Sequence, residues 1–444
     1  MLAISNSEQE VLFRVGPGTP SGEVFRRYWI PVETSGNLGG GRGNIEPSAK
    51  NPIRVRVLGE HLILYRDITG KPGLLAEHCT HRGTSLYYGR VEEDGLRCLY
   101  HGWKYDREGN CLEQPAEPPD SNFRLTVKHP AYPCVEMGGL IFAYLGPPEK
   151  QPPFPKYPML FRKDGITVAG KGNRIQNSNV FLQTLDNILD VWHREIAHGW
   201  YKGTEPVHGI HHARGDEPAT PIKFEKTPWG ACYVTLQNTR ETGVYEYHET
   251  HGVLPVQRSG QLGGSSMNWA VPMDDYTTRW FGVSFHPFDK DGNIPESAFR
   301  RLAQDTPSDS GGPFYDGWFE DVGHYWNYGH PARGGPIWED EAIMSTQGPD
   351  ERGRLPDWDK WRLGTSDRGV LLMHELWEEQ VERVQEGLDP LGIIRGTDAE
   401  QIIPIPGEAM HVSWDEGMRL FNMSLDERIE RRVKQIEHHL PASH

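Results

Sequence analysis

The sequence predicts an α+β protein, with a β-rich N-terminal part followed by a larger part of mixed strands and helices. Three observations indicate this division. Over residues 52–145, short alternating apolar runs are separated by turns such as Gly59-Glu60 and Gly70-Lys71. The proline-rich stretch 147–158 then breaks regular structure. Beyond it the chain shows both helical and strand patterns, so we expect a second domain there.

The pattern predicts three regions. We expect residues 1–45 to form an N-terminal segment that packs on the body, residues 46–150 to form an all-β domain, and residues 151–444 to form the larger domain with C-terminal helices. Within the larger domain, residues 177–198 and 365–384 have the apolar spacing of helices.

The larger domain also has strand patterns and a helix start signal. Short apolar and aromatic runs over residues 222–285 predict strands. Ser424 and Glu427 have the spacing of a capping box, in which each side chain accepts from the other residue's backbone N–H, so we expect a helix to begin there.

Composition narrows the classes of function. The chain has 444 residues and a net charge of −16, which disfavours binding to nucleic-acid phosphates. It lacks an apolar run of about 20 residues, and its first ten residues are polar, so we expect no membrane span and no secretion signal. An odd, sparse cysteine set does not resemble a disulfide framework, and a cytoplasmic location is expected. The five cysteines are Cys79, Cys98, Cys111, Cys134 and Cys232.

Two pairs of cysteine and histidine lie close together in the β-rich part. Cys79-Thr80-His81 is followed, after sixteen residues, by Cys98-Leu99-Tyr100-His101. Thiolates and imidazoles suit either zinc or an iron–sulfur cluster, and the spacing alone leaves both open. Gly83 and Gly102 follow the two pairs, and small residues there let two loops approach one centre.

The segments 79–83 (CTHRG) and 98–103 (CLYHGW) together resemble the Rieske signature of ring-hydroxylating and demethylating oxygenases. The resemblance implies a [2Fe-2S] cluster in which two cysteines hold one iron and two histidines hold the other. The residues it assigns to the cluster are Cys79, His81, Cys98 and His101. The alternative reading is a structural zinc site.

A second constellation lies in the predicted helix over residues 177–198. Asp186, Asp190 and His193 are spaced i, i+4, i+7 and would share one helix face. Charge in an apolar segment is costly unless it is paired or ligates a metal. Asp190 and His193 could instead form a buried salt bridge, with His198 a core residue. On an ideal helix His193 and His198 diverge by about 140°, so a shared metal needs a distortion or a helix end, which Gly199 could mark.

The spacing Asp186-x3-Asp190-x2-His193-x4-His198 is similar to the mononuclear-iron motif of the same oxygenases. Two histidines and a carboxylate form the facial triad of oxygen-activating iron(II). The resemblance implies that His193 and His198 bind iron. It also implies that Asp190 is a bridging carboxylate that hydrogen-bonds His193 and reaches His101 of a neighbouring subunit, where it couples the two centres.

The third iron ligand is expected far downstream. In the family it lies in an acidic stretch before a glutamine- and glycine-containing segment, which corresponds here to residues 338–349. Comparison of the two patterns places the ligand at Asp340, with Glu339 and Glu341 as alternatives.

The resemblance implies the oxygenase (alpha) component of a Rieske non-haem iron system. Its catalytic domain would be a twisted antiparallel sheet covered by helices, and the chain would form a homotrimer or a stacked pair of trimers. Electrons would come from NAD(P)H through a separate reductase or ferredoxin, which agrees with the lack of a Gly-x-Gly-x-x-Gly fingerprint in a strand-to-helix setting.

Residues 16–20, 25–29 and 338–373 resemble the subgroup that contains phthalate 4,5-dioxygenase and 5,5′-dehydrodivanillate O-demethylase. We therefore expect O2-dependent O-demethylation of a methoxy aromatic acid, with ring cis-dihydroxylation of an aromatic carboxylate as the alternative. More distant alternatives are a Rieske electron-transfer protein and a zinc-stabilised scaffold. A substrate carboxylate could pair with one of three arginines that could equally be structural: Arg240, Arg258 and Arg279.

Overall fold

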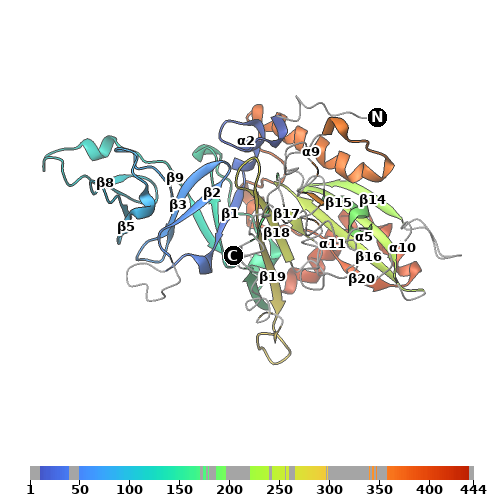
Figure 1. The fold of residues 1–444 in the computed structure, drawn as a ribbon. Helices are drawn as coiled ribbons and strands as arrows, with labels where there is room; N and C mark the ends of the chain where they lie inside the picture. Colours follow the sequence, from blue (N-terminus) through green and yellow to red (C-terminus); the bar gives the residue numbers. More distant parts are fainter. Residues whose placement is uncertain are drawn as a thin grey trace, which may run out of the picture.

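The fold was analysed in a computed structural model of the chain (Figure 1). The structure describes most of the β-rich part and the greater part of the larger domain. The described residues are 11–39, 50–170, 174–176, 179, 187–196, 221–239, 243–255, 257–259, 266–296, 298, 340, 343–344, 347 and 358–439.

Three small antiparallel sheets make up the β-rich part, as the alternating runs predict. The sheet that carries β5 (Arg90–Val91) and β8 (Cys111–Glu113) lies at one end of the molecule, away from the larger domain (Figure 1). The first sheet, in spatial order, is β1 (Trp29–Thr34), β11 (Leu140–Tyr144) and β10 (Cys134–Met137). The second is β2 (Ile53–Val57), β3 (Glu60–Arg66), β4 (Pro72–Ala76) and β9 (Ala131–Tyr132). The third is β5 (Arg90–Val91), β6 (Leu96–Arg97), β7 (Lys104–Tyr105) and β8 (Cys111–Glu113).

A nine-stranded antiparallel sheet forms the larger domain, and the strands predicted over residues 222–285 are confirmed. The main path, in spatial order, is β12 (Gly165–Ala169), β19 (Thr278–Pro287), β18 (Ser266–Pro272), β17 (Gln257–Ser259), β16 (Tyr245–Val253), β15 (Gly230–Asn238) and β14 (Ile222–Thr227). Off this path, β13 (Arg174–Gln176) pairs with β19 and β20 (Ala409–Val412) pairs with β16.

Helices cover both faces of this sheet. Met373 of α9 (Arg368–Gln385) faces Gly252 on one face, where a Cβ added to the glycine would lie 3.5 Å from the methionine. Leu420 of α10 (Trp414–Phe421) packs in a cluster with Val234 and Tyr247, whose side chains point to the other face. The helices are α2 (Pro20–Arg26), α3 (Pro158–Phe161), α5 (Val191–Ile196), α9 (Arg368–Gln385), α10 (Trp414–Phe421) and α11 (Leu425–Ile436). Short 3-10 turns are η1 (Ser35–Asn37), η2 (Leu86–Tyr88), η3 (Phe123–Thr126), η4 (Pro148–Lys150), η6 (Trp358–Lys360), η7 (Thr365–Asp367), η8 (Gly396–Glu400) and η9 (Glu437–His439).

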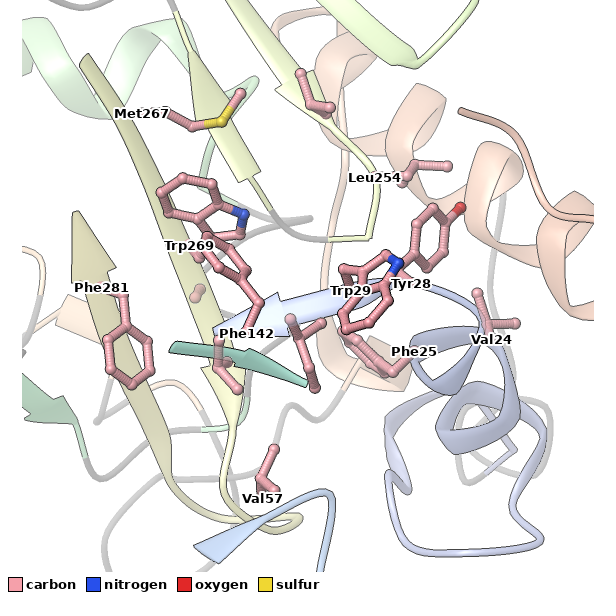
Figure 2. Packing of buried hydrophobic residues seen from close by; sticks show 14 of the residues in the cluster. Val24, Phe25, Tyr28, Trp29, Val57, Phe142, Leu254, Met267, Trp269 and Phe281 are labelled. Atoms are coloured by element: carbon pink, nitrogen blue, oxygen red, sulfur yellow. The ribbon is translucent and has the colours of Figure 1, made fainter. Parts of the chain in front are cut away.

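The N-terminal segment packs on the body. Helix α2 lies beside α9 (Figure 1), where the rings of Phe25 and Trp377 are 4.9 Å apart and the Trp377 indole donates to Ser21 Oγ (2.8 Å). One hydrophobic core continues from here through β11 into the large sheet, where Phe142 meets Trp269 edge to face at 5.6 Å (Figure 2). The N-terminal segment also supplies strand β1 of the first small sheet. The limits of the three predicted regions, residues 1–45, 46–150 and 151–444, stay a prediction.

The continuous helix predicted over residues 177–198 is wrong. Asn179 is not helical, residues 187–189 form a turn, and α5 begins only at Val191. The physical reason is the side chain of Asp190, whose Oδ1 accepts from the backbone N–H of Trp192 (2.9 Å) and of His193 (3.3 Å). A carboxylate in this position starts a helix rather than continuing one.

The two other predicted helices are confirmed. The helix expected over residues 365–384 is α9, which begins at Arg368 after one 3-10 turn. The capping box is present at α11: Ser424 N donates to Glu427 Oε2 (2.7 Å) and Glu427 N donates to Ser424 Oγ (3.3 Å). Among the described helices, none has the length and apolar character needed to cross a bilayer.

Candidate metal centres

The two Cys-His pairs lie on loops with the same backbone structure, residues 79–84 and 98–103. In each loop the N–H of the cysteine donates to the carbonyl of the sixth residue, at 2.9 and 2.8 Å. In each, the glycine at the fifth position donates back to the cysteine carbonyl, at 2.8 and 3.1 Å. Gly83 and Gly102 both have φ of +75°, a conformation that L-residues with a Cβ rarely adopt.

Both glycines suit this conformation, and they differ in the protein atoms around them. A Cβ added to Gly83 would meet no atom within 4 Å, whereas one added to Gly102 would lie 3.0 Å from Pro115 Cγ. Only the second loop therefore combines a left-handed backbone with tight packing.

The loops bring the four predicted cluster residues together. Cys79 and Cys98 are buried, while the two imidazoles are only partly buried, with ring centroids 4.6 Å apart. Trp103 stacks on His81 at 4.4 Å and nearly parallel, at 9°. In each pair the cysteine sulfur therefore lies in the protein interior, and the histidine ring lies nearer the surface.

The donor set fits an iron–sulfur cluster. The pKa of Cys79 is lowered to about 5, chiefly by its hydrogen bond with Cys98 and also by the backbone N–H groups of His81 and Arg82. Such donors favour the thiolate that metal binding requires. Tetrahedral zinc would hold four ligand atoms within about 4 Å of one another. Among the described residues, the group whose ligand atoms all lie within 4.8 Å of one another is a different one. Cys79, His81, Cys98 and His101 therefore do not surround a single point as the ligands of one tetrahedral zinc would.

The second centre joins residues far apart in the sequence. His193 Nε2 lies 3.6 Å from Asp340 Oδ1, and His193 Nδ1 lies 3.5 Å from Asp190 Oδ2. Asn187, which the sequence reasoning missed, has its Nδ2 at 3.1 Å from His193 Nε2 and 3.5 Å from Asp340 Oδ1. The sequence contains a signal for this residue, because Asn187 is a polar side chain three positions before Asp190 within the same motif.

The contacts of His193 define its tautomer. An amide NH2 only donates, so Nε2 accepts from Asn187 and the proton of a neutral ring lies on Nδ1, toward Asp190. A carboxylate on the far nitrogen is the usual support of a metal-binding imidazole. Nε2 has one lone pair, so an iron bound there would take the place of the Asn187 amide, on the side where Asp340 lies.

Several residues of the predicted site are not placed. Asp186, His198, Gly199, Glu339 and Glu341 lie outside the described residues. The structure therefore brings together His193, Asp340 and Asp190, and leaves the other ligand positions as predictions.

The converging group mentioned above is Cys232, Glu249 and His251, all buried. It is an ion-pair network. Trp229 Nε1 donates to His251 Nδ1 (3.2 Å), so Nε2 carries the proton and donates to Glu249 Oε1 (2.9 Å). The Arg428 guanidinium donates to the same carboxylate (2.9 Å) and lies 3.8 Å from Cys232 Sγ. Burial raises the pKa of Cys232 to about 12. The Arg428 guanidinium thus supplies the positive charge beside the Glu249 carboxylate and the Cys232 thiol.

Of the three arginines considered for a substrate carboxylate, Arg279 is described with its side chain. Its Nη2 pairs with Glu33 Oε1 at 2.6 Å, and its guanidinium lies 4.8 Å from the ring centroid of Phe281. It therefore links the N-terminal segment to the large sheet. Arg240 and the side chain of Arg258 lie outside the described residues.

Comparisons with known proteins agree with this organisation. The model of the Rieske [2Fe-2S] domain family matches residues 40–133. The alpha subunit of phenoxybenzoate dioxygenase from Ectopseudomonas oleovorans is 31% identical over 86% of this chain and 87% of its own. The oxygenase subunit of 5,5′-dehydrodivanillate O-demethylase from Sphingobium sp. is 31% identical over 91% of this chain and 86% of its own.

A third relative matches a shorter region. The oxygenase subunit of tert-butanol monooxygenase / tert-amyl alcohol desaturase from Aquincola tertiaricarbonis is 44% identical over 61% of this chain and 58% of its own. Among solved structures, the oxygenase of carbazole 1,9a-dioxygenase in its reduced complex with ferredoxin covers 89% of this chain and 100% of its own, at 20% identity and a TM-score of 0.56. That likeness confirms the α+β fold. The chain therefore belongs to the Rieske non-haem iron oxygenases, as an oxygenase (alpha) component with a Rieske [2Fe-2S] cluster and a mononuclear iron.

Proposed function

We propose that this oxygenase acts on a methoxy aromatic acid and removes the methyl group by monooxygenation. Two of the three relatives described above have names that denote reactions at a saturated carbon, one an O-demethylase and one a tert-butanol monooxygenase. The O-demethylase aligns over 91% of this chain, and this is the observation that carries the proposal. The phenoxybenzoate dioxygenase favours the alternative, cis-dihydroxylation of an aromatic carboxylate.

The proposed reaction balances with dioxygen and NAD(P)H. One oxygen atom enters the methyl C–H bond to give a hemiacetal, and the other leaves as water with two protons and two electrons from NAD(P)H. The hemiacetal then breaks its C–O bond and releases formaldehyde and a phenol. In dihydroxylation both oxygen atoms remain on the ring.

We propose that Cys79, His81, Cys98 and His101 hold the cluster, and that His193, His198 and Asp340 hold the mononuclear iron. The close approach of His193 to Asp340 supports the second set. Iron in that triad supplies the activation of dioxygen. Asp190 positions His193 by capping α5 while its second oxygen faces the imidazole.

We propose a homotrimer, or a stacked pair of trimers, served by a reductase or ferredoxin. Large apolar side chains lie exposed near the cluster loops, which suits a subunit contact. They are Leu99 (71% exposed), Tyr100 (56%), Phe123 (48%) and Leu125 (68%). The Asp190 side chain is also accessible, at 27%, as a contact with a neighbouring cluster requires.

The substrate proposal is tested with the purified oxygenase, a reductase and NADH. The panel contains methoxylated benzoates, phthalate and tert-butanol, and oxygen uptake and formaldehyde are measured together. Formaldehyde equal to the oxygen consumed is expected with a methoxybenzoate. A diol without formaldehyde would replace demethylation by dihydroxylation, and turnover of tert-butanol alone would exclude an aromatic acid as the substrate.

The assembly proposal is tested with Leu99→Asp and, as a control on another exposed apolar side chain, Leu388→Asp. We expect Leu99→Asp to shift the oligomer toward monomers in sedimentation and to lose turnover while keeping the cluster spectrum. Leu388→Asp should change neither. A fully active wild-type monomer would contradict the proposal.

A further inference from the structure

A cavity lies between α5, the edge strand β14 and the first two turns of α9. Its volume is about 760 Å³, and sites for small molecules have volumes of about 300–1,000 Å³. Trp192 lines the cavity from α5, and the next residue of that helix is the proposed iron ligand His193. The cavity is therefore a neighbour of the mononuclear iron site.

The walls of the cavity carry apolar and aromatic side chains from three elements. Ile222 and Phe224 are two residues apart on β14, so both side chains are on the same face of the sheet. Leu371 and Leu372 line the cavity from α9, and Trp192 completes this apolar set from α5. Such walls suit the faces of a flat aromatic ring.

A glycine allows α9 to begin close to the iron site. A Cβ added to Gly369 would overlap the carbonyl oxygen of Leu189 and lie 2.6 Å from Phe224 Cε1. Leu189 directly precedes Asp190, which caps α5. The close packing at Gly369 therefore places its neighbour Arg368 beside the turn that leads into α5.

Two basic residues line the cavity, and only one of them has a charge that is unused by the described protein. Lys223 lies between Ile222 and Phe224 in sequence, so its side chain leaves the other face of the sheet. Its Nζ donates to the Met423 carbonyl (2.9 Å) and lies 3.4 Å from Glu225 Oε1. Arg368 is exposed, and its guanidinium makes no hydrogen bond or ion pair in the described part of the chain.

We propose that this cavity binds the substrate as an aromatic carboxylate, with the Arg368 guanidinium on the carboxylate and the ring against Trp192 and Phe224. A planar guanidinium can hold a carboxylate through two parallel N–H···O bonds. The net charge of the chain is −16, so a local cation is needed to attract an anion. The Arg279 guanidinium is already paired with Glu33, whereas Arg368 is available. The inference rests on the proposed function, which supplies the substrate class.

The first test is calorimetric binding of benzoate, benzamide and acetate to the full-length holoprotein without NADH, so that no turnover occurs. Benzoate should bind more tightly than benzamide, which lacks the charge, and than acetate, which lacks the ring. Arg368→Gln should weaken benzoate binding about tenfold and leave benzamide binding unchanged. Arg383→Gln is the matched control, because it removes the same charge about 22 Å farther along α9 and should change neither affinity.

Glu375 tests the charge of the cavity with the opposite sign. It is an exposed carboxylate that lines the cavity two turns after Arg368, so it repels a bound anion. Glu375→Gln should tighten benzoate binding about twofold, and Glu382→Gln, two turns farther along the same helix, should not. In turnover of a methoxybenzoate, Arg368→Gln should raise KM and leave kcat nearly unchanged, because the lost contact is present in the ground state and the transition state alike.

Unchanged benzoate affinity in Arg368→Gln, or equal affinities of the wild type for benzoate and benzamide, would overturn the inference. If Arg368→Gln does not fold, unchanged affinity in Glu375→Gln would overturn it equally. Failure of the proposed function is separate, since the binding pattern would then hold while no methoxybenzoate released formaldehyde. Formaldehyde release with the same KM in Arg368→Gln and wild type would keep the function and reject this site.

Discussion

The amide of Asn187 lies 3.1 Å from Nε2 of His193. This contact orients the imidazole so that its other nitrogen faces Asp190, while the same amide also reaches Asp340 at 3.5 Å. One neutral side chain therefore contacts two proposed iron ligands that come from distant parts of the chain, and it occupies the Nε2 lone pair that an iron would need.

The double role of Asp190 can be separated by substitution. Asp190→Asn retains an N-cap and removes the charge beside His193, so we expect near-wild-type thermal stability with a large loss of turnover. Asp190→Ala also removes the cap and should cost about 1 kcal/mol more. Oxygen uptake and thermal unfolding distinguish the two effects. Equal stability of both variants would show that the cap contributes nothing.

The proposed iron ligands predict a selective loss of metal. His193→Ala and Asp340→Asn should reduce the iron content from about three to about two per chain, leave about two acid-labile sulfides, and abolish turnover. Glu339→Gln and Glu341→Gln should leave all three quantities unchanged. Loss of iron in either glutamine variant would move the third ligand away from Asp340.

The buried pair of Arg428 and Glu249 predicts a pH-dependent stability. Burial alone would raise the pKa of Glu249, but the hydrogen bond from His251 and the charge of Arg428 together hold it below its usual value. A carboxyl with a lowered pKa in the folded state stabilises the fold above its unfolded pKa of about 4.3, and this stability is lost as the pH falls through the folded value.

Arg428→Met should therefore destabilise the protein by about 3 kcal/mol or more at neutral pH, because it leaves a buried carboxylate without its cation. The difference from wild type should shrink as the pH is lowered toward about 4, where Glu249 of the variant is protonated. Thermal unfolding across this range measures it. The control is Arg419→Met, which breaks the exposed pair with Glu416 and should have no measurable effect.

The two loop glycines should differ in sensitivity. Gly83→Ala adds only the strain of a left-handed residue, about 1–2 kcal/mol. Gly102→Ala adds the same strain and a contact of 3.0 Å with Pro115. We expect a lower yield of bound cluster in Gly102→Ala, measured as acid-labile sulfide per chain. Equal yields would mean that the proline moves aside freely.

The cluster loops could be predicted because their structure is local. The backbone hydrogen bonds between residues of the loop from Cys79 to Thr84 close within six residues, and the residue types that form it appear together in the sequence. The strands over residues 222–285 were equally visible, because continuous apolar and aromatic runs indicate strands that are buried on both faces.

The iron site was harder to predict. Apolar periodicity predicted one long helix through Asp190, but the hydrogen bonds from its carboxylate to the next turn outweigh periodicity and start α5 there. The approach of Asp340 to His193 and the pairing of β20 with β16 depend on contacts across long stretches of chain, which no local pattern encodes.

The bond between Trp377 and Ser21 spans 356 residues, and that between Tyr28 and the Leu391 carbonyl spans 363. A ribosome makes α2 long before it makes α9, so Phe25 emerges without the ring it packs against. The core that joins the two metal-binding parts can close only after α9 has been synthesised. Assembly of the active enzyme is therefore a late event, after the local cluster loops have had time to fold.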